Sequence, residues 1–348
     1  MKNITIKSRS GSYKVIFTND LKFLEKESKS FLLVDQTIFN LYKRYLKFNN
    51  IIYIKANESA KSLEFAKKIY LDLLSKNFTK KDQIIAIGGG ITQDLAGFVA
   101  STIFRGVKWI YAPTTLLAQT DSCIGGKTSI NLKGFKNIIG TIFPPEKVII
   151  SNAFLKTLDE DKIKSGIGEL TKLLILGWKG KTHEKLITII NNYDKREFSL
   201  KTYIYEALIV KKSFIEKDEL DQGVRNLLNY GHTLGHSLES VSNFKISHGI
   251  AIVYGMIFAN ILAKNRNLIK ENISDFLNKR IFKALIPPQI SVDFLNQHEL
   301  LEIAKKDKKV VGNNLSFVLP KGNLEFVKVN DVTRYEFKTA FKQFTKII

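Results

Sequence analysis

Short apolar runs and amphipathic stretches alternate through the first half of the chain. Residues 2–17 alternate polar and apolar side chains, which is typical of an edge hairpin with one buried face. After this hairpin, continuous apolar runs predict buried strands, and a 3.6-residue period predicts helices. The predicted strands are 31–35, 51–54, 84–87, 109–112 and 148–150, with helices over 41–48, 58–75 and 92–104 between the first four. This order indicates a parallel sheet covered by helices.

The second half of the chain is dominated by helical periods. They cover 159–177, 181–192, 199–216, 226–241, 249–265, 272–283 and 298–306, and only 316–319 and 325–327 resemble strands. The change falls near Thr157. We therefore predict an α/β domain over residues 1–157, a Rossmann-like parallel sheet with helices, followed by a mainly α-helical domain over 158–348.

Composition narrows the class of protein. The chain has 348 residues, of which 44% are hydrophobic, so it can form two domains of ordinary size. No apolar run reaches the length of a membrane span, and the first residues resemble a strand instead of a signal peptide. The single cysteine, Cys123, excludes an internal disulfide. These features predict a cytoplasmic protein that does not act at a membrane.

The net charge of +21 leaves two interpretations, a nucleic-acid partner or an anionic small molecule. The lysines are spread along the whole chain, and the densest group, residues 305–309, is short. There is no basic tail and no low-complexity block. We favour a general bias towards lysine, with a subset of lysines binding a small anion and no nucleic-acid partner.

Three of the five histidines lie close together in the sequence. His232 and His236 are four residues apart, so they share one face of a helix, for which Asn229 is a suitable N-cap. His248 stands at the head of the next apolar run. The three imidazoles could bind one ion such as zinc, or the pair could be one buried and one solvated ring.

Two glycine-containing segments could bind anions. The run 88–94 lies between a predicted strand and a helix, where a phosphate could approach backbone N–H groups, although a plain tight turn has the same pattern. The segment 113–127 ends in Gly125-Gly126-Lys127, and Lys127 could bind phosphate or carboxylate or could be merely solvated. This segment lacks the first glycine of a P-loop, which excludes nucleotide triphosphate hydrolysis on that pattern.

Glu169 and Lys172 are three residues apart on a predicted helix. A surface ion pair is the ordinary interpretation of this spacing. Glu169 could also be the third ligand for an ion held by His232 and His248.

Taken together, these segments resemble the 3-dehydroquinate synthase family over residues 35 to 330. The matching motifs occur in order along the chain: 88–94, 97–98, 105–106, 113–118, 121–122, 125–127, 136–137, 155–158, 168–169 with 172, 218–219 with 225, 228–233, 248–249 and 307–309. Three positions depart from the family pattern, namely Cys123 for serine, Asn152 for aspartate and Asp159 for proline. None of them is an expected ligand, so the resemblance implies an active enzyme.

The resemblance implies conversion of 3-deoxy-D-arabino-heptulosonate 7-phosphate to 3-dehydroquinate and phosphate in the shikimate pathway. It implies NAD and a divalent ion, Zn²⁺ or Co²⁺, as cofactors, a sugar-phosphate substrate and a homodimer. Two other activities remain as alternatives. One is another NAD- and metal-dependent sugar-phosphate cyclase, and the other is a metal-dependent polyol dehydrogenase.

The resemblance also assigns site residues. It places the metal on Glu169, His232 and His248 and makes His236 a substrate contact, which replaces the site of three histidines. It implies a cofactor site formed by Asp35, Glu58, Lys61, Gly89, Gly90, Ile91, Asp94, Thr114, Thr115, Asp121, Lys127, Lys136, Phe154 and Thr157. The implied catalytic and substrate-binding residues are Lys127, Lys172, Lys211, Arg225, Asn229, His236, Asn137, Lys308 or Lys309, and Arg105 from a dimer partner.

Overall fold

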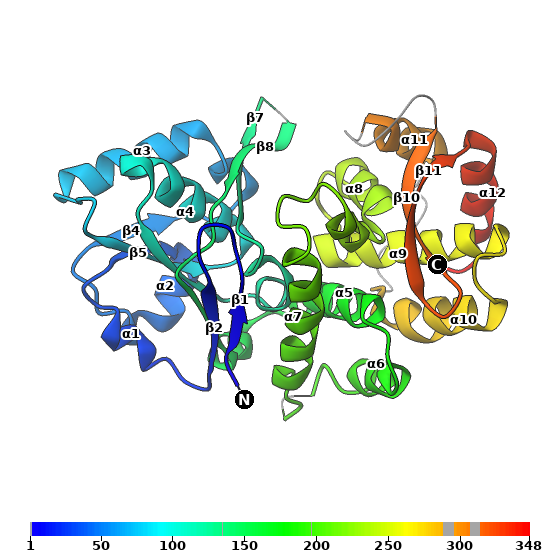
Figure 1. Cartoon of the computed structure of the whole chain (residues 1–348), viewed down its shortest axis with the longest axis horizontal. Helices are drawn as coiled ribbons and strands as arrows, with labels where there is room; N and C mark the ends of the chain where they lie inside the picture. The colour runs from blue at the N-terminus through cyan, green and yellow to red at the C-terminus, as the bar shows by residue number, and fades with distance from the viewer. Residues whose placement is uncertain (1, 134, 196, 288–295, 307–313) are drawn as a thin grey trace. The chain divides into compact units, whose positions relative to one another are not determined.

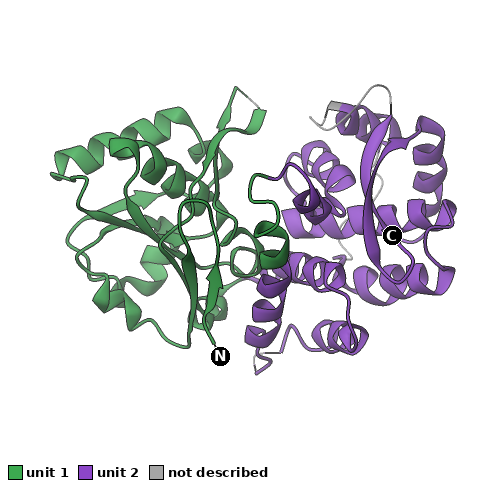
Figure 2. Cartoon of the chain, in the orientation of Figure 1, with its two compact units in different colours: residues 1–158, 211–220 green, residues 159–210, 221–348 purple. Residues whose placement is uncertain are grey.

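The chain forms two compact units (Figures 1 and 2). The computed structural model describes residues 2–133, 135–195, 197–287, 296–306 and 314–348. Unit 1 comprises Met1–Leu158 and Lys211–Leu220, and unit 2 comprises Asp159–Val210 and Asp221–Ile348. No sequence feature had indicated that residues 211–220, which include the end of helix α7 (Lys201–Ile215), belong to unit 1.

Unit 1 contains a seven-stranded sheet. Its order is β1-β2-β9-β6-β5-β3-β4, and every neighbouring pair is parallel except the antiparallel pair β1 and β2. The predicted edge hairpin and the predicted parallel sheet are therefore confirmed. The strands are β1 (Ile4–Ile6), β2 (Tyr13–Thr18), β3 (Phe31–Asp35), β4 (Ile51–Ile54), β5 (Gln83–Gly88), β6 (Lys108–Pro113) and β9 (Lys147–Ser151).

The helices of unit 1 cover both faces of this sheet. Ile85 and Ile87 of β5 pack on one face with Ile38 and Tyr42 of α2. Successive strand side chains point to opposite faces, so Ala86 faces the other side, where α4 packs on β5 and β6. The helices are α1 (Phe23–Lys26), α2 (Gln36–Tyr42), α3 (Leu63–Ser75) and α4 (Gly90–Thr102).

Two sequence predictions in unit 1 need correction. The helix predicted over 41–48 begins earlier, at Gln36, because the Asp35 carboxylate accepts the N–H groups of Thr37 and Ile38 as an N-cap. It ends in a 3₁₀ turn at Tyr45. The antiparallel pair β7 (Lys127–Leu132) and β8 (Phe135–Ile142) was not predicted, because its residues lack a clear alternation of apolar side chains.

Unit 2 is mainly helical, which confirms the predicted fold class. Helix α9 is buried along almost its whole length and packs against α5, α8, α12 and strand β10. The helices are α5 (Glu160–Leu176), α6 (Thr182–Ile190), α8 (His232–Val241), α9 (His248–Asn265), α10 (Glu271–Asp275), α11 (Gln297–Lys306) and α12 (Arg334–Phe344). Strands β10 (Leu315–Lys321) and β11 (Glu325–Val332) form an antiparallel hairpin.

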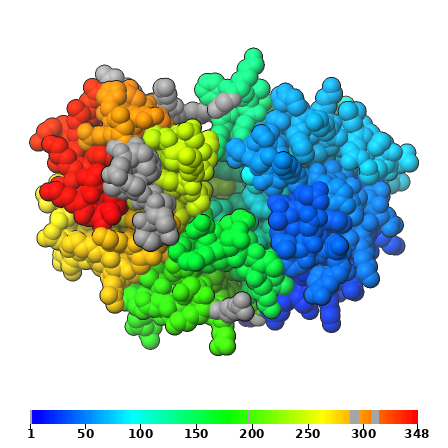
Figure 3. All heavy atoms as spheres, turned by 180° about the vertical axis from the view of Figure 1, so that it is seen from behind, coloured from blue at the N-terminus to red at the C-terminus, as the bar shows by residue number. Residues whose placement is uncertain are grey.

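The C-terminal helix α12 was not predicted, and it contributes to the surface of unit 2, shown in red in Figure 3. Thr333 and Glu336 form a capping box at its start. In the part of the chain that the structure describes, no helix combines the length and the hydrophobicity needed to cross a membrane.

Candidate active site

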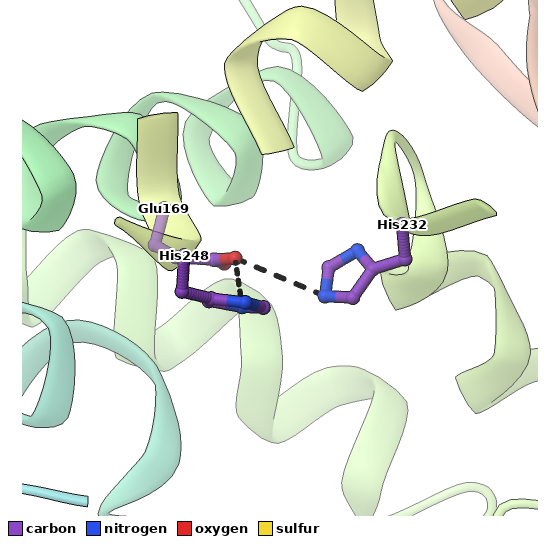
Figure 4. Close-up of side chains that lie close together, drawn as sticks. All are labelled: Glu169, His232 and His248. Atoms are coloured by element: carbon purple, nitrogen blue, oxygen red, sulfur yellow. Dashed lines mark ion pairs between the residues drawn. The ribbon is translucent and has the colours of Figure 1, made fainter. Parts of the chain in front are cut away.

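Three side chains from three helices of unit 2 converge on one point (Figure 4). Glu169 comes from α5, His232 is the first residue of α8, and His248 is the first residue of α9. Glu169 Oε1 lies 3.8 Å from His232 Nε2 and 3.4 Å from His248 Nε2. One ligand atom from each residue lies within 4.8 Å of the other two. One carboxylate and two imidazoles form a ligand set typical of catalytic zinc, which leaves further coordination positions open.

The carboxylate of this group is buried together with a lysine. Glu169 has no exposed side-chain surface, and its Oε2 lies 2.5 Å from Nζ of Lys172, whose side chain is 2% exposed. The interpretation of this pair as a surface ion pair is therefore wrong. Burial removes the hydration of the Glu169 carboxylate. Each positive charge placed beside it, such as a cation bound by the imidazoles of His232 and His248, therefore stabilises its charged form.

The two imidazoles have opposite protonation preferences. Burial lowers the pKa of His232 well below its usual value, and the positive charge of Lys172 lowers it further. Burial alone would also lower the pKa of His248, but hydrogen bonds with Glu169 and Glu239 outweigh it and raise that pKa to about 10. In the metal-free chain at neutral pH, His232 is therefore neutral and His248 is charged.

Glycines let the three helices that carry the candidate ligands approach closely. A Cβ on Gly249, beside His248, would lie 1.8 Å from the carbonyl oxygen of Ser165 on α5. Gly231, beside His232, has a φ of +82° and would bring its Cβ within 2.7 Å of the Ile252 carbonyl oxygen on α9. Each histidine therefore stands at a helix start that packs directly against a neighbouring ligand helix.

The local structure before His232 differs from the prediction. A helical period was predicted over 226–241, with Asn229 as the N-cap of a helix that starts near Tyr230, but α8 begins at His232 and its N-cap residue is Gly231. Asn229 instead ends a 3₁₀ helix and donates its Nδ2 to the Asn226 carbonyl oxygen. The left-handed conformation at Gly231 separates the two helical segments, which excludes a continuous helix.

His236 lies outside the group of Glu169, His232 and His248. It belongs to a second group with Glu239 and His248, whose ligand atoms also lie within 4.8 Å of one another. A small cavity of about 130 Å³ has His232, His236 and Asn229 among its lining residues. The same cavity is lined by Lys328 of β11, which no sequence motif had indicated. Glu239 was also missed, although its position three residues after His236 on one helix was visible in the sequence.

In unit 1, the glycine run begins helix α4. Gly89 is the N-cap residue and Gly90 is the first residue of the helix, so backbone N–H groups are available there for an anion. Thr114 follows strand β6, and its buried Oγ1 has no hydrogen-bond partner among the described residues. The neighbouring Thr115 Oγ1 accepts the N–H of Ala118. Ile91 follows Gly90 in the first turn of α4 and is partly buried.

Several expected cofactor residues of unit 1 bind one another. Lys61 Nζ lies 2.6 Å from Asp94 Oδ2 and donates to Asn137 Oδ1 at 2.5 Å. Burial raises the pKa of Asp94 above its usual value, although the charge of Lys61 opposes this effect. Glu58 accepts a hydrogen bond from Asn131 Nδ2 and lies 3.7 Å from Lys136 Nζ.

The other expected residues of unit 1 lie at strand ends or in packed positions. Asp35 caps α2 at the end of β3, and Lys211 Nζ lies 2.9 Å from Asp121 Oδ1. Thr157 Oγ1 is hydrogen-bonded to the Tyr42 hydroxyl. Phe154 is fully buried in the core, so its main chain is the part that a cofactor would contact.

Arg105 belongs to a strained turn of unit 1. Phe104, Arg105 and Gly106 have φ values of +50°, +60° and +109°. Arg105 is exposed and lines a cleft of about 440 Å³ together with residues of the turn between β1 and β2. Non-glycine residues in this region are conformationally costly, so the turn holds Arg105 in an outward position at the expense of stability.

The remaining expected residues differ in burial and in secondary structure. Lys127 is exposed at the start of β7, whereas Arg225 is buried in the 3₁₀ helix of unit 2. Lys308 and Lys309 lie outside the described residues. The structure therefore gives no position for the lysine expected to meet the substrate there.

Two family models match the chain. The 3-dehydroquinate synthase N-terminal model covers residues 51–165, and the C-terminal model covers residues 166–310. The chain belongs to the 3-dehydroquinate synthase family. A 3-dehydroquinate synthase of Streptococcus equi subsp. equi is 35% identical over an alignment of 341 positions, which covers 93% of this chain and 94% of that protein. One of Clostridium tetani is 39% identical and covers 90% of this chain and 83% of that protein. The family predicted from the sequence motifs is confirmed.

A solved structure shares the fold of both units. The 2-epi-5-epi-valiolone synthase of Streptomyces hygroscopicus subsp. jinggangensis, solved with NAD⁺ and Zn²⁺ bound, superposes with a TM-score of 0.82. It is 24% identical, and the similarity covers 98% of each chain. This likeness supports the fold, whereas the family assignment rests on the closer sequence relatives.

Proposed function

We propose that this member of the 3-dehydroquinate synthase family converts 3-deoxy-D-arabino-heptulosonate 7-phosphate to 3-dehydroquinate and phosphate, a carbon–oxygen lyase reaction of aromatic amino acid biosynthesis. The structural observation that carries the proposal is the convergence of Glu169, His232 and His248 in unit 2. Its sequence support is the match of both family models, which together cover residues 51–310. The substrate carries phosphate and carboxylate, which suits the basic residues expected at the site.

The residues present fit both proposed cofactors. Glu169, His232 and His248 would hold a divalent cation, since a buried carboxylate and two imidazoles are ligands that zinc prefers. The first turn of α4, with Gly89 and Gly90, would bind the phosphates of NAD. When bound, NAD would exchange a hydride with the substrate and regain its starting state each turnover, while the ion would increase the acidity of substrate hydroxyls.

Basic residues of the chain would bind the anionic groups of the substrate, and a histidine would transfer a proton. In unit 2, the buried guanidinium of Arg225 and the ammonium of Lys172 would bind anionic groups of the substrate, with Asn229 adding a hydrogen bond. His236 is exposed beside the cavity of His232 and would move a proton at one of its ring nitrogens. In unit 1, Lys127 and Lys211 would add positive charge. We retain Lys308 among the proposed substrate contacts.

The assignment of roles to the two domains also remains part of the proposal. Residues 1–157 would bind NAD, and residues 158–348 would bind the metal and the substrate. We further propose a cytoplasmic homodimer in which Arg105 contributes to the site of the partner copy. The strained, outward position of Arg105 at a cleft supports this role, since backbone strain is often found at functional sites.

Redox accounting tests the proposed reaction. The chain is incubated with the heptulosonate phosphate, Zn²⁺ and a limiting amount of NAD, and phosphate, the ring product and NADH are followed together. We expect phosphate and 3-dehydroquinate in large molar excess over NAD, with no steady rise in NADH. Steady NADH production from a neutral polyol would show that the chain is a dehydrogenase, and turnover of another sugar phosphate in place of the heptulosonate would indicate a different cyclase.

An arginine pair supplies the matched control for this experiment. Arg225→Ala should slow phosphate release about tenfold or more, because a charge-assisted contact contributes about 1.5–3 kcal/mol. Arg334→Ala removes an exposed arginine of the same unit, whose ion pair with Glu302 lies on the surface, and should leave the rate unchanged. Equal rates for both variants would contradict the role of Arg225.

A further inference from the structure

Helix α8 carries a carboxylate beside the histidine of the neighbouring helix. Glu239 Oε2 lies 3.2 Å from His248 Nδ1, and the Glu239 side chain is 14% exposed. On the other side of the same ring, His248 Nε2 lies 3.4 Å from Glu169 Oε1. The imidazole of His248 therefore lies between two carboxylates, one at each ring nitrogen.

We propose that Glu239 is a positioning residue of the metal site, which accepts the Nδ1–H of His248 and thereby directs the lone pair of Nε2 towards the ion. This inference rests on the proposed function, because it takes Glu169, His232 and His248 as the ligands. A carboxylate at the distal nitrogen of a ligating histidine fixes the tautomer and the ring orientation and makes the ligating nitrogen more basic. Glu239 would do this from the helix that begins with the other ligand, His232.

The other histidine is oriented by a different kind of group. His232 Nδ1 lies 3.2 Å from the main-chain oxygen of Tyr230. Tyr230 is itself fixed, because its buried hydroxyl donates to Asn260 Oδ1 at 2.6 Å and Asn260 Nδ2 donates to Asn278 Oδ1 at 2.8 Å. A main-chain acceptor remains in every side-chain variant. Of the two imidazoles, only that of His248 therefore has an orienting acceptor that a substitution removes.

The ligand geometry also allows Glu239 to be considered as a direct ligand, with His236 and His248. A neutral imidazole has one lone pair and one N–H group, so it can bind an ion at one nitrogen while donating a hydrogen bond at the other. If His248 bound one ion through Nδ1 and another through Nε2, the ring would have to lose both protons. The pairing of Nε2 with Glu169 and of Nδ1 with Glu239 therefore favours one ion and one orienting carboxylate.

Metal affinity tests this role without any turnover. Metal-free full-length chain is titrated with Zn²⁺ against a chromophoric chelator and with Co²⁺ while the visible absorption spectrum is recorded. Glu239→Ala and Glu239→Leu remove the acceptor, whereas Glu239→Gln keeps an oxygen that accepts the Nδ1–H. Glu184→Ala, at an exposed glutamate of the same unit, is the matched control. Thermal unfolding of each metal-free variant checks that it is folded, and the leucine variant decides if the alanine variant does not fold.

We expect one ion per wild-type chain. Removing the acceptor should weaken Zn²⁺ binding about 10–100-fold and change the Co²⁺ spectrum, because the ring of His248 loses its fixed orientation. Glu239→Gln should lose less than about tenfold and keep the wild-type spectrum, and Glu184→Ala should match wild type. Wild-type affinity and spectrum in a folded Glu239→Leu chain would overturn the positioning role alone.

Two other outcomes would also overturn the inference. Two ions in the wild-type chain, with one lost in Glu239→Leu, would make Glu239 a ligand of a second site. A wild-type chain that binds no ion would overturn the proposed metal centre together with the inference. Failure of the proposed metal centre is thus seen in the wild-type chain, whereas failure of the role of Glu239 alone is seen only in the Glu239→Leu chain.

Discussion

The candidate metal centre of unit 2 and the candidate cofactor site of unit 1 are built in different ways. In unit 2, three candidate ligands from three closely packed helices point at one another with their functional atoms already close. In unit 1, the expected residues lie at several strand ends and helix starts, and Lys61 and Asp94 bind each other. The two sites differ because an ion is bound by a few converging atoms, whereas a dinucleotide is bound along an extended surface.

This difference changes what a substitution should do. In unit 2, helix packing and the geometry of the candidate ligands depend on the same positions, because a Cβ added to the glycine beside either histidine would clash with the main chain of a neighbouring helix. In unit 1, the start of α4 has room around Gly90, where the atom nearest to an added Cβ is Ser122 Oγ at 3.9 Å. Stability and binding should therefore change together in unit 2 and separately in unit 1.

The largest effect is expected from Gly249→Ala. Its Cβ would lie 1.8 Å from the Ser165 carbonyl oxygen, so α9 must move away from α5 and carry His248 with it. The hydrogen bond from the Gly249 N–H to Ser165 Oγ, now 3.0 Å long, would be strained. We expect a loss of about 1–3 kcal/mol in the free energy of unfolding. Zn²⁺ binding should weaken about 100-fold or more, since displacing a ligand exceeds the effect of losing its orienting partner.

Thermal unfolding and chelator competition measure both effects of Gly249→Ala. Its binding of NAD, measured by calorimetry, should stay close to that of the wild-type chain, which makes it a control for unit 1. A Gly249→Ala chain with unchanged stability and unchanged metal affinity would show that the close helix contact does not determine the site.

A smaller and more selective effect is expected from Gly90→Ala. The turn accommodates the added methyl group, and alanine at a helix start should leave folding unchanged or stabilise it by about 0.4–1 kcal/mol. The same methyl group would separate a phosphate from the backbone N–H groups of α4, so NAD affinity should fall about tenfold, or about 1.4 kcal/mol. Full NAD affinity by calorimetry would place the cofactor elsewhere, and Zn²⁺ affinity should not change.

The sequence was most informative where a local pattern decides the structure. The apolar runs 31–35 and 84–87 became β3 and β5 because four or five consecutive buried side chains suit a strand covered on both faces. The helices α5 and α9 followed their apolar periods in the same way. These elements could be predicted from local amino-acid patterns alone, without reference to residues distant in the sequence.

Features that depend on distant contacts were missed or misplaced. The break at Gly231 lies where α9 approaches closely, since an added Cβ there would lie 2.7 Å from the Ile252 carbonyl oxygen. The pairing of Lys61 with Asp94 joins residues that are 33 positions apart. Glu239 could be seen on the helix of His236, but its contact with His248 requires the packing of α8 on α9. Glu169 was predicted as a third ligand through spacing and family motifs, while its complete burial with Lys172 was not anticipated.

The smallest expected effect is the release of protons on binding, and it also distinguishes the two units. The pKa of His248 in the metal-free chain is about 10, above the ordinary value of about 6.5, because Glu169 and Glu239 hold its charged form. A raised histidine pKa contributes stability that is fully present below about pH 6.5 and is lost as the pH rises through about 10. An ion needs the neutral ring, so its binding at pH 7 to 8 should displace about one proton from His248 and none from His232, whose pKa is already low. Zn²⁺ affinity should then rise about tenfold per pH unit in this range.

Calorimetry in two buffers that differ in their enthalpy of ionisation measures the number of protons released. NAD binding in the same buffers should release close to none, because the ion pair of Lys61 and Asp94 is already formed. A metal titration that releases no proton would show that His248 is neutral before the ion binds, and the contrast between the two units would not extend to their protonation.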